Sequence, residues 1–250
     1  MHSLKARPKP LCTNYTCEVN LVDQTSVLLM AREGSQRFKN KNVAKFGVEP
    51  AKTTLLQWKI EQLLEVFSPE RVILSSDSND YLDLGSEYKI SLHSRDKNLA
   101  ESGSFAENLR TVAKQAQTDC VLYANGPCNP LIGPRRMREF LTSIDNENLL
   151  NGAFAVEELK GYLLYRNEWL NFEPGEKHLG SENLENPFRV VWALTCRSTK
   201  NVISQGSMFS ACKPVLTVPT WTAVDIDYEE DLVIAEAFLG KYHEYEKKQP

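Results

Sequence analysis

The sequence predicts an α/β fold in which a mainly parallel sheet carries helices on both faces. Short continuous apolar runs, typical of strands buried on both faces, alternate with segments whose apolar residues recur at helical spacing. The resulting order, β-α-β-β-α-β-α in the first part of the chain, favours right-handed crossovers and ligand binding beyond the carboxyl ends of the strands. With 250 residues, of which 42% are hydrophobic, the chain is long enough for one domain with a real core.

Seven short segments are predicted as strands. The first, SVLLMA, is continuously apolar and ends at a charged loop that contains Gly34. The later ones repeat this pattern, with β-branched and aromatic residues between polar boundaries. The predicted strands lie at 26–31, 71–75, 88–92, 119–124, 152–156, 188–196 and 223–227.

Four helices are predicted from apolar residues spaced by three and four positions. In the first helix these are Leu56, Ile60, Leu63 and Phe67, and Ser104 with Glu107 forms an S-x-x-E capping box at the start of the second. The third follows a proline-containing loop, and the fourth ends the chain. The predicted helices lie at 54–67, 104–116, 137–144 and 232–242.

Two stretches do not follow this alternation. Residues 1–24 are polar and lack periodicity, so they are predicted to be a tail ahead of a domain over residues 25–250. Residues 157–187 are rich in Glu, Asn, Tyr and Trp, and they are interpreted as an insertion or interaction subdomain.

Composition narrows the classes of function. A net charge of -4 argues against the broad basic surface of a protein that binds nucleic acid or an anionic membrane. No run approaches 18 apolar residues and the amino terminus lacks the apolar run of a signal peptide, so a cytoplasmic location is expected. The six cysteines show no C-x-x-C spacing and are expected to be free thiols: Cys12, Cys17, Cys120, Cys128, Cys196 and Cys212.

The loop after the first predicted strand is the first candidate site. It holds four cations within ten residues, namely Arg32, Arg37, Lys39 and Lys41, around a Gly-Ser turn. Backbone N–H groups of such a turn, together with arginine and lysine, suit a triphosphate. The loop is neither a Walker motif nor a dinucleotide-binding motif, and composition alone favours a solvated basic loop over a binding site.

Two aspartates near the carboxyl terminus are the second candidate. Asp225 and Asp227 are two positions apart in a predicted strand, so they share a face, with Cα atoms about 6.5 Å apart at about 3.3 Å per residue. Such a pair suits Mg²⁺, which takes one or two carboxylates together with water and phosphate oxygens. The alternative is that Asp227 only caps the last helix, with Glu230 completing the arrangement.

Five segments in chain order carry a resemblance. They are A-R-x-G-S-x-R-x-x-x-K-N over 31–42, R-V-I-L-S-S-D over 71–77, Arg95 followed by Leu99-Ala100, P-C-N-P-L over 127–131, and V-D-I-D followed by A-E over 224–236. Together they resemble the motifs of the acylneuraminate cytidylyltransferases, the CMP-sialic acid synthetases and their relatives. The similarity extends over about residues 26–239.

This resemblance implies a Rossmann-like nucleotidyltransferase that joins CTP and an acidic 2-keto sugar into the CMP-sugar, with release of pyrophosphate. It implies catalytic roles for Arg32, Lys41, Asp225 and Asp227, with Mg²⁺ on the two aspartates. The base that accepts the proton of the sugar hydroxyl stays open between Asp225 and a hydroxide on the metal. The implied nucleotide-binding residues are Ala31, Arg32, Gly34, Ser35, Arg37, Lys41, Asn42, Arg95 and Ser104, with Asn42 and Arg95 on the cytosine. Residues 157–187 correspond to the family's dimerisation element, so a homodimer is expected.

The sequence departs from the family pattern in three places. Gln36 replaces a lysine, Gly126 replaces a glutamine associated with the sugar, and Val191-Trp192 stands where the family has Asn-Gly. These departures leave three alternatives open. The acceptor is another ulosonic acid, such as 3-deoxy-manno-octulosonate; the protein binds nucleotide without catalysis; or it is a glycosyltransferase with a D-x-D metal site.

Overall fold

A seven-stranded mixed sheet forms the centre of the protein, in the order β11-β7-β10-β6-β1-β4-β5. The computed structural model describes residues 21–35, 37–101, 104–175 and 178–247. The strands of this sheet are β1 (Thr25–Met30), β4 (Val72–Ser76), β5 (Ser91–Ser94), β6 (Cys120–Tyr123), β7 (Ala153–Glu158), β10 (Phe188–Ser198) and β11 (Pro214–Thr217). All neighbouring strands are parallel except that β10 runs antiparallel to both β6 and β7. The predicted, mainly parallel sheet is confirmed.

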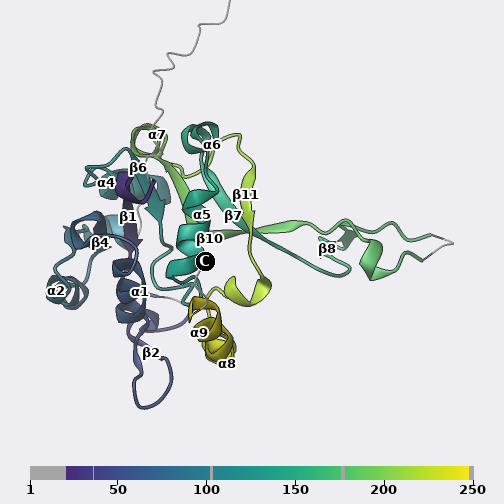
Figure 1. Ribbon diagram of the computed structural model, residues 1–250, viewed down its shortest axis with the longest axis horizontal. Coiled ribbons are helices and arrows are strands. Elements are labelled where there is room, and N and C mark those ends of the chain that lie inside the picture. The colour runs from purple at the N-terminus through teal and green to yellow at the C-terminus, as the bar shows by residue number, and fades with distance from the viewer. Residues whose placement is uncertain (1–20, 36, 102–103, 176–177, 248–250) are drawn as a thin grey trace, which may run out of the picture.

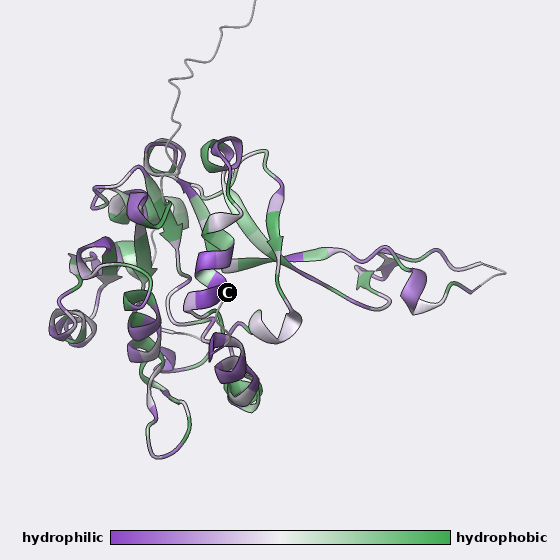
Figure 2. Ribbon diagram, viewed as in Figure 1, coloured by the Kyte–Doolittle hydropathy of each residue, from purple (hydrophilic) through white to green (hydrophobic). Residues whose placement is uncertain are grey.

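Helices cover both faces of the sheet, as the alternation of apolar runs predicts (Figure 1). Successive residues of β1 point to opposite faces: Leu29 packs in a cluster with α1 and α5, whereas Leu28 packs with α4 and α7. The helices are α1 (Leu55–Leu64), α2 (Asn79–Glu87), α3 (Lys97–Glu101), α4 (Phe105–Ala113), α5 (Pro134–Thr142), α6 (Asn146–Asn151), α7 (Thr199–Gln205), α8 (Glu229–Ala237) and α9 (Leu239–Lys247). Apolar colour is concentrated in the sheet strands, and polar colour is spread over the surrounding helices (Figure 2).

Short elements complete the chain. Two small hairpins pair β2 (Lys45–Phe46) with β3 (Thr53–Thr54), and β8 (Leu164–Tyr165) with β9 (Glu168–Trp169). Single 3₁₀ turns lie at Leu21–Gln24, Lys41–Val43, Pro69–Arg71, Ser181–Asn183 and Thr220–Thr222. Since Leu21 and Val22 pack against the core, the ordered domain begins before residue 25, and residues 1–20 of the predicted tail lie outside the described residues.

Several predicted elements need correction. Residues 223–227 form no strand but an irregular segment, and the last helix is two helices, α8 and α9, separated at Phe238. The strand predicted over 88–92 lies at Ser91–Ser94. The edge strand β11 was not predicted because it begins at a proline and is only four residues long. Helices α2, α6 and α7 were also missed, since each is short and largely polar.

Between β7 and β10 the chain forms an arm that includes the β8–β9 hairpin. Figure 1 shows the described residues of this arm, 159–175 and 178–187, extending well away from the sheet. It coincides with the predicted insertion at 157–187, although β7 continues to Glu158. Within the part of the chain that the structure describes, no helix is long and apolar enough to cross a bilayer.

Candidate functional site

A cavity of about 670 Å³ opens beyond the carboxyl ends of β1 and β6, where a parallel α/β sheet is expected to bind ligands. It brings together residues from distant parts of the sequence. Nine predicted site residues line it: Ala31, Arg32, Ser35, Arg37, Lys41, Asn42, Arg95, Asp225 and Asp227. Gly34 belongs to the same loop but does not line the cavity, and Gln36 lies outside the described residues.

The loop after β1 is fastened to the neighbouring strand. Ala31 N donates to Ser75 O at 3.0 Å, and Glu33 N donates to Asp77 Oδ1 at 3.0 Å. Farther along, Asn42 Nδ2 donates to Arg32 O at 2.8 Å and so closes the loop on itself. These bonds hold the loop at the cavity mouth with the exposed Arg32 side chain lining it.

Lys41 and Arg37 converge on Asp227. Lys41 is buried, and its Nζ donates to Ile226 O at 2.5 Å and lies 3.4 Å from Asp227 Oδ1. Arg37 Nη2 lies 2.6 Å from the same carboxylate oxygen. Burial alone would lower the pKa of Lys41, but Cys128, Asp227 and Asp225 raise it above its usual value. The ammonium therefore stays charged.

Asp225 is the carboxylate whose environment fits a cation best. Its Oδ1 is buried and makes no hydrogen bond to a described residue, and its Oδ2 is 3.4 Å from Asn125 Nδ2. Burial, and then repulsion by Asp227, raise the pKa of Asp225 to about 6. A divalent cation would supply the missing partner and relieve this repulsion. Among the described residues no group of three His, Cys, Asp or Glu side chains could hold a metal, so further ligands would be water and phosphate, as Mg²⁺ prefers.

Arg95 enters the cavity from the end of β5 with unused hydrogen-bonding capacity. It is buried, its Nη2 lies 3.7 Å from Asp77 Oδ1, and neither Nε nor Nη2 makes a hydrogen bond to a described residue. Asp77 thus faces Arg95 and also accepts from the loop after β1. Asp77 ends the R-V-I-L-S-S-D motif, and its contacts with both Arg95 and the loop after β1 could not be predicted from that motif.

Helix α1 supports the site through hydrogen bonds to the loop over residues 129–132, a role that was not predicted from the sequence. Lys59 is fully buried, and its Nζ donates to Asn129 O at 2.9 Å and to Ile132 O at 3.0 Å. Trp58 and Gln62 both donate to Pro130 O, at 2.9 and 2.7 Å. Burial lowers the pKa of Lys59 to about 7. A lysine between Leu56 and Ile60, on the apolar stripe of this helix, was the signal that could have revealed the role.

The loop braced by α1 holds the aspartate segment in turn. Asn129 Nδ2 donates to Val224 O at 3.0 Å, and Ile226 N donates to Cys128 O at 2.8 Å. These hydrogen bonds hold the aspartate segment in place without a neighbouring strand. Asp225 and Asp227 line the same cavity, in line with the prediction that they share a face.

Gly126 in this loop has a φ of +55°, and a Cβ there would lie 2.7 Å from Met30 O. This tight approach to the end of β1 explains the departure from glutamine, because any side chain would clash with backbone and adopt an unfavourable conformation.

Ser104 does not line the cavity. Its hydroxyl accepts from Glu107 N at 3.2 Å, and Glu107 Oε2 accepts from Ser104 N at 3.2 Å, which completes the predicted capping box of α4. The geometry gives Ser104 a helix-capping role.

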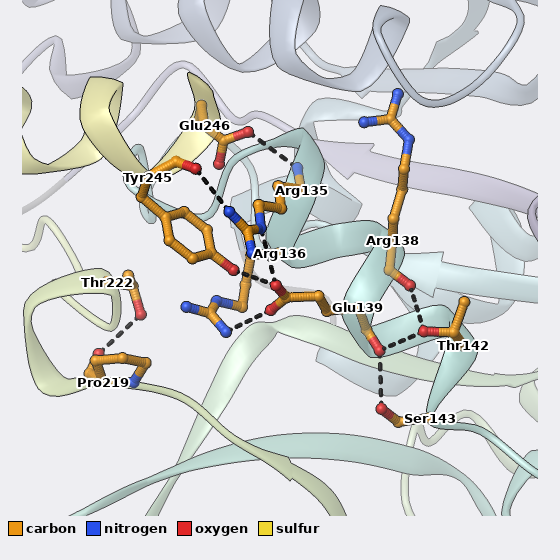
Figure 3. A network of polar contacts seen from close by, with 10 residues as sticks. All are labelled: Arg135, Arg136, Arg138, Glu139, Thr142, Ser143, Pro219, Thr222, Tyr245 and Glu246. Atoms are coloured by element: carbon orange, nitrogen blue, oxygen red, sulfur yellow. Dashed lines mark hydrogen bonds and ion pairs between the residues drawn. The ribbon is translucent and has the colours of Figure 1, made fainter. Parts of the chain in front are cut away.

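Two arginines of α5 take part in a network of polar contacts with α9 (Figure 3). Arg136 Nη1 lies 2.5 Å from Glu139 Oε2, and both Arg135 and Arg136 stack on the ring of Tyr245 in α9. Arg138 is exposed and donates to Glu65 O. None of the three lines the cavity, so this network joins α5 to α9.

Two of the described cysteines, Cys120 and Cys196, are buried, and Cys128 and Cys212 are partly buried; all four are free thiols. Cys12 and Cys17 lie outside the described residues. Cys128 lines the cavity beside Lys41, and burial raises its pKa against the opposing effect of that lysine. The expectation of free thiols is confirmed for these four cysteines.

Comparisons with known proteins find solved structures of similar fold. A solved structure of CMP:2-keto-3-deoxy-manno-octonic acid synthetase complexed with CTP is similar, with 14% identity and a TM-score of 0.60 over 87% of this chain and 99% of that chain. The 4-diphosphocytidyl-2C-methyl-D-erythritol synthase of Anaerococcus prevotii is similar at 15% identity and a TM-score of 0.55, over 86% and 98% of the two chains. The bifunctional IspDF of Campylobacter jejuni is similar at 14% identity and a TM-score of 0.60, over 84% of this chain and 54% of that one.

No curated protein matches the sequence. The solved structures, at these identities, show the shared fold. A family model described as cytidylyltransferase matches residues 26–174, which is more than half of the chain. The chain therefore belongs to the cytidylyltransferase family.

Proposed function

We propose that this protein transfers CMP from CTP to an acidic 2-keto sugar of the nonulosonic, sialic-acid type and releases pyrophosphate. One observation carries the proposal: a single cavity combines a cationic loop, an arginine with unused donors and a pair of carboxylates. Family and fold support a transferase that uses CTP. In the reaction, a sugar hydroxyl attacks the α-phosphorus of CTP, the new phosphate ester forms, and the bond to pyrophosphate breaks.

The cationic loop would bind the triphosphate. Arg32 and Lys41 lie at the cavity wall, and backbone N–H groups near Gly34 and Ser35 add neutral donors. Phosphate oxygens would compete with Asp227 for Arg37 and Lys41, and would gain the two charge-assisted contacts that Asp227 now makes. Arg95 and Asn42 would recognise the cytosine, since their N–H donors and amide oxygen complement its carbonyl and amine.

Asp225 and Asp227 would hold Mg²⁺, for which the unpaired Oδ1 of Asp225 provides the structural support. When bound, the ion would offset negative charge on the phosphates. The protein's own part is alignment: the loop over 128–130 fixes Val224 and Ile226 by hydrogen bonds and thereby fixes both carboxylates.

A smaller cavity of about 210 Å³ supports an acidic acceptor. Arg189, Trp192 and Asp225 line it, and the last two also line the larger cavity. Arg189 sits directly across from Glu157 in the β10–β7 ladder and pairs with its Oε1 through Nε and Nη2. Its side chain is still half exposed, so it would meet the carboxylate of the sugar beside Asp225.

The proposed function predicts pyrophosphate release that depends on both CTP and an acidic 2-keto sugar. Purified protein with Mg²⁺ would be incubated with CTP and a panel of nonulosonic and octulosonic acids, and the CMP-sugar identified by mass spectrometry. Neutral sugars and UTP or ATP serve as controls and are expected to give no product. Release of a nucleoside diphosphate when a nucleotide-diphosphate sugar replaces CTP would instead indicate a glycosyltransferase, and CTP binding without any product would indicate a non-catalytic protein.

The panel also tests a second candidate, activation of 3-deoxy-manno-octulosonate. This candidate is favoured by the likeness to the octonic acid synthetase and by Gly126, which lacks the glutamine side chain that the resemblance associates with the incoming sugar. The sugar with the highest kcat/KM decides between the two.

We further propose that the arm mediates a homodimer. Its hairpin exposes Leu164, Tyr165 and Leu170, each more than half accessible, beside a cluster of edge-to-face rings formed by Tyr162, Trp169 and Phe172. An isolated two-stranded hairpin is marginal in water, so a second copy of this chain that packs arm against arm would cover these residues.

Leu164→Glu with Leu170→Glu is therefore expected to convert a dimer into a monomer, because two buried carboxylates at an apolar contact are costly. Sedimentation equilibrium measures the mass. Leu150→Glu, an equally exposed leucine on α6, is the matched control and should leave the dimer intact. A monomeric wild-type protein, or a double variant that stays dimeric, would contradict the assignment of this arm.

A further inference from the structure

Trp192 lies where β10 leaves its regular pairing with β7. The register changes from Val191 opposite Ala155 to Thr195 opposite Phe154, so residues 192–194 have no partners in β7 and form a bulge. Thr195 Oγ1 donates to Trp192 O at 3.2 Å within this bulge. Bulges turn side chains away from their regular direction, and this one places the Trp192 indole at the cavities.

Neighbouring rings hold the indole in place. Its ring centroid lies 5.0 Å from Phe209, 5.9 Å from Phe105 and 6.0 Å from Tyr123, all in edge-to-face arrangements. The side chain nevertheless remains 37% exposed. A ring fixed in this way and open on one side loses little conformational entropy when a ligand covers it.

Trp192 and Asp225 are shared by the two cavities and therefore stand at their junction. Arg189 is a charged group of the smaller cavity, and the smaller cavity also has an apolar lining in Val190, Val191 and Ala223. A ligand in the smaller cavity that contacts both Arg189 and Asp225 shares that cavity with the indole. The small cavity thus offers an anion contact, an aromatic wall and an exit toward the nucleotide cavity.

We infer that Trp192 determines acceptor specificity by stacking on an apolar face of the acidic sugar, such as ring C–H groups or an acyl substituent, while Arg189 holds the carboxylate. This inference rests on the proposed function and adds the apolar character of the acceptor. The bulge orients the wall, and the sugar hydroxyl is directed toward Asp225. Acceptors that present only hydroxyl groups on this face bind more weakly, because their polar groups lose water without gaining a partner.

The test measures KM separately for CTP and for acceptor with wild-type protein and Trp192→Ala, Trp192→Phe and Phe188→Ala variants. Phe188 is exposed on the same strand but lines neither cavity, so it is the matched control. Trp192→Ala is expected to raise the acceptor KM about tenfold or more while the CTP KM changes less than about twofold. Trp192→Phe should keep the acceptor KM close to the wild-type value. Acceptor probes are an N-acetylated 2-keto-3-deoxy nonulosonic acid and its counterpart with a hydroxyl in place of the acetamido group; the increase should be larger for the first.

An unchanged acceptor KM, or equal increases for CTP and acceptor, would overturn the inference. Titration calorimetry of the two acids against wild-type and Trp192→Ala protein separates this outcome from a failure of the proposed function. If no sugar supports pyrophosphate release but the acids bind and Trp192→Ala weakens that binding, the proposed reaction is wrong and the Trp192 subsite stands. If neither acid binds wild-type protein, the subsite is overturned as well.

Discussion

Replacing both aspartates, Asp225→Asn with Asp227→Asn, is expected to lower kcat by at least about a thousandfold, because the variant loses the carboxylates that would hold Mg²⁺ beside the reacting phosphate. Pyrophosphate release at saturating CTP and acceptor measures this. Asp227 also occupies Arg37 and Lys41, so the double variant should bind CTP at least as tightly as wild type in the absence of magnesium. The loss of rate therefore separates from any loss of binding.

Glu229→Gln is the matched control for this pair. Glu229 is an exposed acid only two residues beyond Asp227, in the first turn of α8, and it lines neither cavity. Its replacement should leave kcat within about twofold of wild type. If the Asp225–Asp227 double variant kept more than a tenth of the wild-type kcat, the aspartates would not be the metal-binding pair.

Asp225→Asn alone is expected to stabilise the metal-free protein at neutral pH. The pKa of Asp225 is raised from 3.8 to about 6, so between these values the folded protein binds more protons than the unfolded chain. The free energy of unfolding therefore falls as pH rises through this range, and the ionised carboxylate costs up to about 3 kcal/mol at pH 7. An uncharged amide avoids most of that cost.

Urea unfolding of both proteins in EDTA, at several pH values between 4 and 7.5, measures this effect. The variant's advantage should be largest near pH 7 and should fade toward pH 4, where Asp225 is protonated in wild type as well. Added magnesium should narrow the gap at pH 7 by stabilising wild type. If the variant's gain in the free energy of unfolding did not change with pH, the gain would come from packing rather than from charge.

The loop after β1, which is proposed to bind the nucleotide, could be predicted from sequence because its position depends only on the strand directly before it. The segment from Ala31 to Asn42 follows a buried strand directly, so its position at the carboxyl end of that strand follows from the fold class. The aspartates were placed on one side even though the predicted strand was wrong. Both aspartates line the cavity in the irregular segment, whose residues on either side of Asp225 are held by hydrogen bonds from Asn129 Nδ2 to Val224 O and from Ile226 N to Cys128 O.

The smaller cavity, which is proposed to bind the acceptor, could not be predicted in the same way. The position of Trp192 depends on a change of register between β10 and β7, and single-sequence patterns carry no register. Lys59 illustrates a related limit. Its carbonyl partners are about 70 positions later in the chain, so nothing near it in the sequence shows what satisfies its charge.

The reversed direction of β10 means that the two proposed binding sites are formed by segments far apart in the sequence. Because β10 runs antiparallel to β6, its first half extends past the carboxyl end of β6 and reaches the cavity. The loop after β1 reaches the same cavity from the other neighbour of β6. Under the proposed function, substitutions around residues 189–194 are expected to change which acceptor binds, while the loop over residues 31–42 that is proposed to bind the triphosphate keeps its sequence. Acceptor choice would then evolve through a few residues, independently of CTP binding.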